Sequence, residues 1–326
     1  MADRALSVEK PWSLKQFLFQ WEWLLALIFI LVMAANSFIS PFFLNASTLL
    51  HAPRNFLDRG FIVFPMMMVI LLGRIDISVG SNVALTSVIM GVTFNAGLPM
   101  PLAIVLALFV GTILGGITGL LQIKFFELPA MIVTLSTMIL YRGIAFMILE
   151  NMAAGGFPDW FLFFSWGYVG RIPFILLAFA AAAVIFGIVI HKTAFGRTIY
   201  AMGNNFLACK YSGIKTDRVL LKVSLLTGLM CAVCAIFLTS RMGSTRPNVA
   251  INYELDVIAM VVLGGVSTAG GTGKIAGPIL AIFIIGFLNF GLGLMNISAQ
   301  VNLIILGLML ILSVLVMNLR SGKPKV

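Results

Sequence analysis

The sequence predicts an all-α polytopic membrane protein with about ten transmembrane helices, and three observations favour that class. Hydrophobic residues make up 61% of the 326 residues and charged residues only 10%, far from the averages of soluble proteins. Apolar segments of about 20 residues, close to what a bilayer needs, follow one another along the chain. Lys and Arg concentrate in alternate loops, as expected for cytoplasmic loops. No Pro/Ser-rich or charged linker divides the chain, so residues 1–326 are expected to form a single transmembrane domain.

The predicted spans are bounded by charged or turn-forming stretches. Residues 1–20 are polar at first and carry three basic residues, which predicts a cytoplasmic N-terminus rather than a cleavable signal. Residues 97–101 contain two prolines and predict an exposed hairpin. The basic tail 320–326 predicts a cytoplasmic C-terminus. The spans are expected at 21–39, 60–72, 81–96, 102–123, 129–149, 172–190, 223–240, 257–265, 275–294 and 301–319.

Two of these segments, 60–72 and 257–265, are short and run into glycine-containing stretches at 73–80 and 264–274. Interrupted apolar segments at matching places in two halves are typical of broken helices beside a translocation path. The alternative is that the glycines only permit tight helix packing, which is also expected of the glycine-rich span 102–123. The sequence therefore predicts broken helices in each half and leaves the exact span count there open.

The distribution of basic residues supports this topology. Of the 21 Lys and Arg residues, 15 fall on the predicted inner side and five outside. Only Arg142 lies within a predicted span, where it is expected to pair with a carbonyl or carboxylate between helices. The net charge of +10 follows from this bias, so a nucleic-acid partner is not indicated.

Residues 191–222 form the longest polar interruption and hold six of the 21 basic residues, which predicts a cytoplasmic loop. Its centre is expected to be a short helix over 206–212. Asn204 and Asn205 offer N-cap side chains, and Gly213 stands where a left-handed C-cap is favoured. Such a helix could be gripped by another protein, although an ordinary solvated loop is the alternative.

Asp76 is the acidic residue closest to a span interior. Intramembrane carboxylates are costly and often serve as proton relays. The alternative, which we prefer, is that Asp76 caps the N-terminus of the following helix, where a negative charge suits the helix dipole.

Several other sequence patterns do not indicate a catalytic, metal or nucleotide-binding site. The stretch 270–274 (GGTGK) lacks the first glycine and the final Ser/Thr of a phosphate-binding P-loop. Cys231 and Cys234 form a CxxC inside an apolar helix and are expected to be small packing residues. His51 and His191 lie far apart, so the sequence predicts no metal site, no cofactor and no catalytic constellation.

Four separated motifs together resemble the permease subunits of bacterial ABC sugar importers, the ribose-type and branched-chain amino-acid-type superfamily. They are GRIDISVGS at 73–81, LPAMIVTLSTMILYRGIA at 128–145, FGRTIYAMGNNFLACKYSGI at 195–214, and the glycine-rich 261–294. The resemblance covers nearly the whole chain in the expected order. Within the family, residues 243–265 are most similar to the branch that imports rhamnose or autoinducer-2.

The resemblance implies a role for the central loop and a set of partners. The loop would hold the coupling helix that docks into a two-cassette ATP-binding subunit. The other expected partners are a second permease, identical or different, and a periplasmic sugar-binding protein, all at the bacterial inner membrane. Arg74 departs from the family pattern, which more often has glycine there. The motif residues expected to couple to the ATPase are Gly203, Asn204, Asn205, Ala208, Ser212 and Gly213.

The leading hypothesis is a non-enzymatic permease that moves a small neutral sugar by alternating access. A rhamnose-like deoxyhexose, autoinducer-2 or a pentose would fit, with ATP hydrolysis on a separate subunit. An ion-coupled secondary transporter using Asp76 is the alternative, and a membrane enzyme is third. Polar candidates for the substrate path are Asp76, Ser78, Asn82, Thr134, Ser136 and Asn289.

Overall fold

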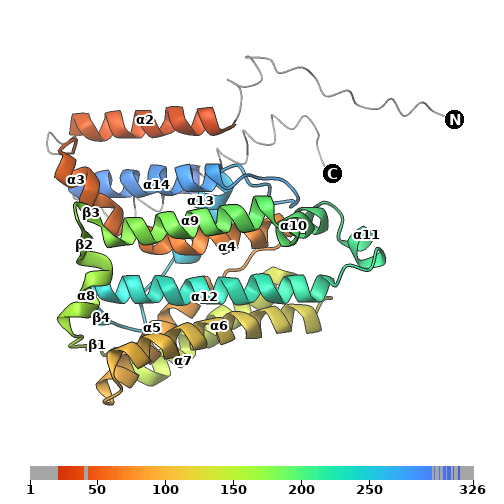
Figure 1. Ribbon diagram of the computed structural model, residues 1–326, viewed down its shortest axis with the longest axis horizontal. Coiled ribbons are helices and arrows are strands. Elements are labelled where there is room, and N and C mark those ends of the chain that lie inside the picture. The colour runs from red at the N-terminus through yellow and green to blue at the C-terminus, as the bar shows by residue number, and fades with distance from the viewer. Residues whose placement is uncertain are drawn as a thin grey trace.

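The long helices lie side by side, with their ends at two opposite faces of the bundle (Figure 1). The computed structural model describes residues 21–39 and 43–295, with isolated positions from 297 to 315. One face carries α8 and the four two-residue strands, where β1 pairs with β4 and β2 with β3, and the opposite face carries α10 and α11. In chain order the elements are α2 (Trp21–Ile39), α3 (Ala46–His51), the 3₁₀ helix η1 (Ala52–Asn55), α4 (Leu57–Leu71), α5 (Val79–Asn95), α6 (Met100–Lys124), α7 (Ala130–Leu149), β1 (Ala154–Gly155), α8 (Asp159–Trp166), β2 (Tyr168–Val169), β3 (Ile172–Pro173), α9 (Phe174–Lys192), α10 (Ala194–Asn204), α11 (Phe206–Tyr211), α12 (Thr216–Met242), β4 (Ser244–Thr245), α13 (Tyr253–Leu263) and α14 (Ala276–Leu294).

Six of the described helices, α2, α6, α7, α9, α12 and α14, are long and apolar enough to cross a membrane. This confirms the predicted all-α membrane class. The predicted spans 60–72 and 257–265 correspond to α4 and α13, which have only 15 and 11 residues. The count of ten spans and the cytoplasmic termini therefore stay predictions. Residues 1–20, most of the predicted span 301–319, and the tail 320–326 lie outside the described residues.

Helix α4 forms the centre of the described bundle. Every residue from Leu57 to Leu71 except Arg59 is buried, and α9, α12, α13 and α14 pack around it. The ring of Phe61 stacks on Phe237 of α12 at 4.9 Å between centroids. A helix that is apolar on all sides is stable only inside such a packed ring of neighbours.

Helices α6 and α12 cross at a seam of glycines. A Cβ atom added to Gly115 would lie 2.6 Å from Gly228 Cα, and one added to Gly228 would lie 2.9 Å from Gly115 Cα. The backbones therefore touch, with no room for a side chain on either helix. This confirms the expectation that the glycine-rich span permits close helix contact.

Replacing Gly115 with valine is expected to destabilise the protein by about 3 kcal/mol, because the obstructing atoms belong to the α12 backbone and cannot move aside. Thermal unfolding of the purified protein in detergent measures the loss. Gly187→Val in α9 is the matched control, since no atom lies within 4 Å of a Cβ added there. Equal loss of stability in both variants would show that the seam is not the cause.

Both predicted breaks are present, and they meet. Residues 72–78 separate α4 from α5, and residues 264–275 separate α13 from α14. The Gly271 amide of the second break donates to the carbonyl of Leu71, the last residue of α4, at 2.8 Å. The hydrogen bond therefore connects the end of α4 to the segment before α14, which goes beyond permitting tight helix packing.

A buried polar network ties α4, α12 and α13 at the end of the bundle that carries α8. Asp58 is fully buried and accepts hydrogen bonds from Arg241 at 2.8 Å and from the Tyr253 hydroxyl at 3.1 Å. Arg59 pairs with Asp256 and lies over the Tyr253 ring, 4.7 Å from its centroid. The charges compensate one another in a region with little access to water.

Two of the cysteines and both histidines make packing or hydrogen-bond contacts within the fold. Cys231 and Cys234 are fully buried in the main apolar cluster, which confirms that they are packing residues. His51 hydrogen-bonds to the Tyr168 hydroxyl, and His191 accepts from the Ile275 amide. Within the described ranges, no three His, Cys, Asp or Glu side chains are grouped to hold a metal ion.

Candidate functional site

The predicted polar loop 191–222 consists mostly of helix. The end of α9, all of α10 and α11, and the start of α12 occupy it. The short helix expected at 206–212 is α11, which ends one residue earlier. Helix α10 was not predicted, although apolar residues such as Phe195, Ile199 and Met202 recur in it at helical spacing.

The ends of α11 are capped locally. The Asn205 side chain accepts from the Ala208 amide at 2.9 Å, which confirms the predicted N-cap. Gly213 has φ of 82° and supplies the predicted left-handed residue, directly after the C-cap Ser212. The prediction for Asn204 was wrong: it is the last residue of α10, and its amide points back to other backbone groups.

Helix α11 presents apolar side chains outward at the end of the bundle. Leu207 is 61% exposed and Tyr211 is 88% exposed, one turn apart. The opposite side packs into the bundle, with Cys209 buried against Met202 and Leu220. A tyrosine this exposed on a capped helix is typical of a protein-docking surface. The sequence reading missed this pair, although its four-residue spacing in a polar loop was visible.

Helix α10 connects α11 to both breaks. Gly203 lies so close to the Leu71 carbonyl and to the Gly271 amide that a Cβ atom would lie 2.5 Å from the latter. The Asn204 side chain donates to the Gly271 carbonyl at 3.3 Å and to Tyr200 O at 2.9 Å. This contact point therefore fixes α10 to the end of α4 and to the segment before α14.

Tyr200 adds a further bond to the second break. Its hydroxyl donates to the Gly273 carbonyl at 2.7 Å. Burial raises the pKa of Tyr200, so the hydroxyl keeps its proton and remains a donor. A movement of α11 would therefore pull on residues 264–275 through several bonds at once.

Four of the polar path candidates gather around the first break. Asp76 accepts from the Ser78 amide at 2.8 Å and the Ser78 hydroxyl at 2.7 Å. Ser78, not Asp76, is the N-cap residue of α5, so the preferred capping interpretation of Asp76 is not confirmed. Asn82 donates to the Gly111 carbonyl, and Thr134 donates to the Ile75 carbonyl. All four side chains are buried, with their polar atoms engaged inside the protein.

The remaining two candidates lie apart. Ser136 is exposed on α7 and donates to the Ile132 carbonyl in its own helix. Asn289 lies on α14 beside Arg59 and Phe290 in a different cavity. The six candidates therefore do not form one site, and their role in transport stays a prediction.

The two arginines singled out from the sequence both have partners. Arg142 donates to the carbonyls of Pro247 and Val249, at 2.8 and 2.7 Å, which confirms the expected carbonyl pairing. Arg74 donates to Gln122 at 3.1 Å, and its guanidinium lies 5.2 Å from the centroid of the Phe126 ring. Arg74 thus connects the first break to α6 and to the loop after it.

Comparison with known proteins decides the family. The family model described as "Branched-chain amino acid transport system / permease component" matches residues 56–314. The chain belongs to this permease family. The match starts just before α4 and includes both breaks and the α10–α11 unit, and with the candidate spans it makes this permease a multi-pass protein of the bacterial inner membrane.

Similar curated proteins span almost the whole permease. The ribose import permease protein RbsC of Bacillus subtilis is 39% identical over 297 residues, covering 90% of this chain and 92% of its own length. The autoinducer 2 import system permease protein LsrD of Escherichia coli K12 is 35% identical over 301 residues, covering 90% and 91%. No solved structure matches the chain.

Proposed function

We propose that this permease is the membrane-spanning subunit of an ATP-driven importer for a small sugar of the ribose or autoinducer-2 type. Relatives named for import of those two compounds cover 90% of the chain. The sugar would pass from a periplasmic binding protein through a pair of permeases. ATP would be hydrolysed on a separate two-cassette subunit, so the permease itself would not be an enzyme.

The observation that carries the proposal is the exposed apolar face of α11. Leu207 and Tyr211 would fit a groove in the ATP-binding subunit. The capped ends of α11 would keep the helix intact when that subunit moves it. Cysteine and aliphatic contacts on the opposite side hold α11 to the rest of the bundle.

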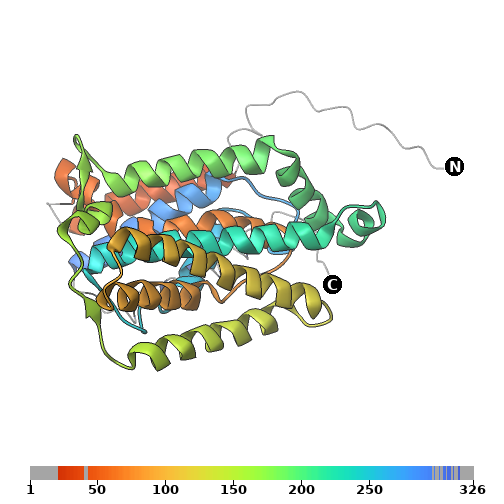
Figure 2. The same ribbon diagram turned by 60° about the horizontal axis from the view of Figure 1, so that its bottom comes forward.

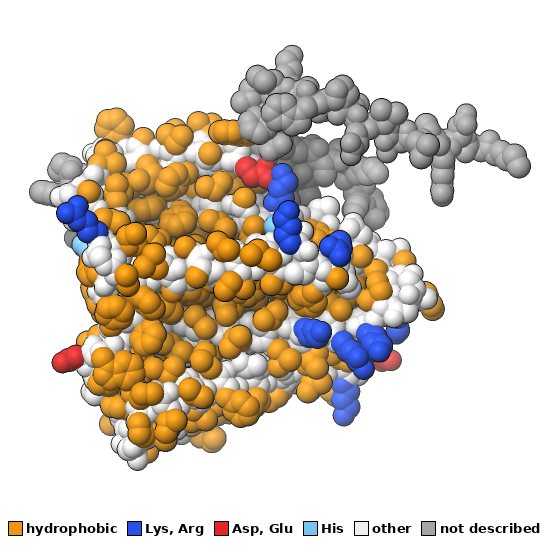
Figure 3. All heavy atoms as spheres, in the orientation of Figure 1, with side chains coloured by type: hydrophobic (Ala, Val, Ile, Leu, Met, Phe, Trp, Pro, Cys, Tyr) orange, Lys and Arg blue, Asp and Glu red, His pale blue; other side chains and the backbone are white. Residues whose placement is uncertain are grey.

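The charge distribution supports a cytoplasmic position for this face. The topology that we propose has ten spans and both termini on that side. Apolar side chains cover the flank of the bundle, and Lys and Arg gather at the end that carries α10 and α11 (Figure 3). This is the arrangement that the positive-inside rule gives for a cytoplasmic surface.

The proposed mechanism is alternating access driven through α10. Closure of the ATPase would move α11, and α10 would transmit that movement to Leu71 and Gly271, where the two breaks meet. Because irregular backbone lacks the internal bonds of a helix, the breaks are the parts of the fold that can rearrange at low cost.

Purification from membranes tests the proposal. A tagged wild-type permease should bring down a two-cassette ATPase, identified by mass spectrometry and ATP hydrolysis. A Leu207→Ser/Tyr211→Ser variant should lose it, because serine removes the apolar contacts while keeping the helix exposed. Trp160→Ser/Phe163→Ser on α8, a similar change at the opposite face, is the control. If the folded wild-type permease brings down no ATPase, the proposed importer function is refuted.

The ion-coupled alternative gains no support from the surroundings of Asp76. Its Oδ1 atom already accepts hydrogen bonds from the Ser78 amide and hydroxyl. Uptake that persists with an uncoupler while ATP is held constant would exclude that alternative.

A further inference from the structure

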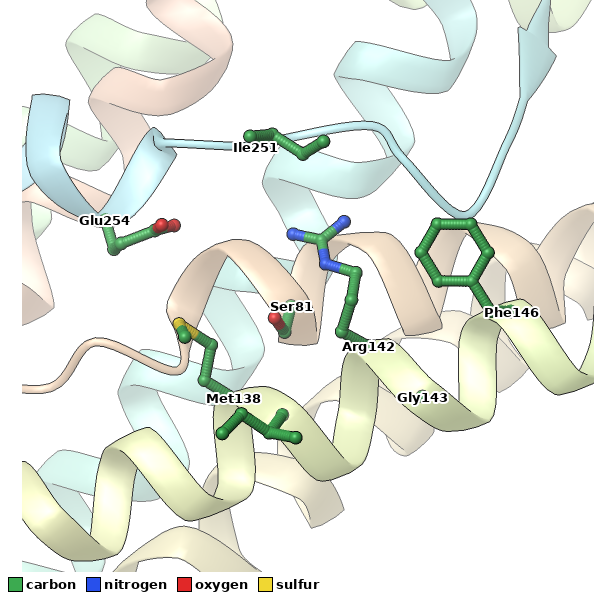
Figure 4. Close-up of a pocket in the computed structure, with 8 residues that line it drawn as sticks. Ser81, Met138, Arg142, Gly143, Phe146, Ile251 and Glu254 are labelled. Atoms are coloured by element: carbon green, nitrogen blue, oxygen red, sulfur yellow. The ribbon is translucent and has the colours of Figure 1, made fainter. Parts of the chain in front are cut away.

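A cavity of about 430 Å³ lies where α5, α7 and the segment before α13 meet. Figure 4 shows that Arg142 from α7 and Glu254 from α13 both point into this space, with Ser81 of α5 between them. Met138, Phe146 and Ile251 supply apolar walls. The cavity thus combines three polar side chains with an apolar lining, which is typical of small-molecule sites.

The cavity lies within the apolar thickness of the protein. Arg142 is seven residues before the end of α7 at Leu149, about 10 Å along the helix axis. Helix α7 stands at the edge of the bundle (yellow-green in Figure 2), with exposed apolar side chains on either side of the cavity, such as Leu135 and Met147. Charged groups at this depth are stable only in a protein-lined or water-filled space.

The wall of the cavity is irregular backbone held in place by Arg142. Residues 246–252 are not helical, and Ala250 and Asn252 have φ of 55° and 66°. Arg142 satisfies two of their carbonyls, Pro247 and Val249. Non-helical backbone at membrane depth occurs only where it is buried in protein or lines a water-filled cavity.

Glu254 is the acidic residue of this cavity. Its Oε2 atom is buried against Gly80, where an added Cβ atom would lie 2.3 Å from it, and has no hydrogen-bond partner within the described part of the chain. The side chain as a whole is half-buried and lines the cavity, so the rest of the carboxylate is available to a ligand that brings donors. Arg142, across the cavity, balances its charge, which suits a neutral ligand better than an ionic one.

We infer that this cavity holds the transported sugar on its way through the permease. Glu254 accepts from sugar hydroxyls, Arg142 donates to them, and Ser81 can do both. Phe146 and Ile251 cover the C–H surface of the sugar. This inference rests on the proposed function and assigns its site to residues outside the path predicted from the sequence.

The test uses the complete importer reconstituted in proteoliposomes, with uptake of labelled D-ribose, L-rhamnose and autoinducer-2 measured beside ATP hydrolysis. Glu254→Gln keeps the shape but removes the charge-assisted bonds, and is expected to lower uptake about tenfold. Ser81→Ala is expected to lower it several-fold. ATP hydrolysis stimulated by the loaded binding protein should stay near the wild-type rate, because α11 is unchanged. Glu150→Gln, an exposed acid just beyond α7, is the control.

The possible outcomes distinguish failure of the sugar site from failure of the proposed importer function. Wild-type uptake in both variants would overturn the sugar site while leaving the importer intact. Uptake and ATP hydrolysis that fall together in the same proportion would also overturn it, since that indicates a folding or coupling defect. Absence of uptake of all three compounds by the wild type, despite active ATP hydrolysis, would refute the proposed function itself.

Discussion

Replacing Gly203 with leucine is expected to abolish sugar uptake while leaving the ATP-binding subunit attached to the permease. A side chain at this position would collide with the Leu71 carbonyl and the Gly271 backbone, and neither can move without displacing a helix end or a break. Helix α10 would be pushed away from both, but the exposed face of α11 would be unchanged. We expect a loss of uptake of at least about tenfold, as is typical when a coupling contact worth 1.4 kcal/mol or more is broken (about tenfold per 1.4 kcal/mol).

Uptake into proteoliposomes, co-purification of the ATPase and its hydrolysis rate are measured together. Gly187→Leu in α9 is the control, because an added Cβ there meets no atom within 4 Å. If Gly203→Leu transports sugar at the control rate, the contact between α10 and the breaks does not carry the coupling.

Replacing Asp58 with asparagine is expected to cost about 3–5 kcal/mol of stability, the usual penalty for removing one partner of a buried ion pair. Asp58 is fully buried and accepts from both Arg241 and Tyr253. Without its charge, the Arg241 guanidinium is left beside Arg59 with fewer counter-charges. The α4, α12 and α13 ends should then separate at a lower temperature.

Thermal unfolding in detergent measures this loss, with the exposed Asp159→Asn on α8 as the control. The double variant Asp58→Asn/Arg241→Gln should be more stable than the sum of its two single changes predicts, because it no longer buries an unpaired arginine. An unfolding temperature equal to that of the control would mean that the network does not hold the ends of α4, α12 and α13 together.

The sequence determined the features that depend on neighbours along the chain. Apolar length predicted the six described candidate spans, and glycine-containing stretches predicted the breaks now found at 72–78 and 264–275. The Asn205 cap and Gly213 set the position of α11 to within one residue at its end. Each of these signals comes from residues at most a few positions apart, so it can be read without knowing the fold.

Only the tertiary structure decided which distant groups meet. The carbonyl partners of Arg142 lie 105 and 107 residues further along the chain, and Asn204 reaches Gly271 across 67 residues. Glu254 drew no attention in the sequence, because acids such as Glu254 and Asp256 in the first turn are an ordinary helix start. It became a candidate sugar ligand once packing placed it in a cavity opposite Arg142. The physical reason is that helix packing selects one arrangement of remote surfaces, and local patterns do not encode it.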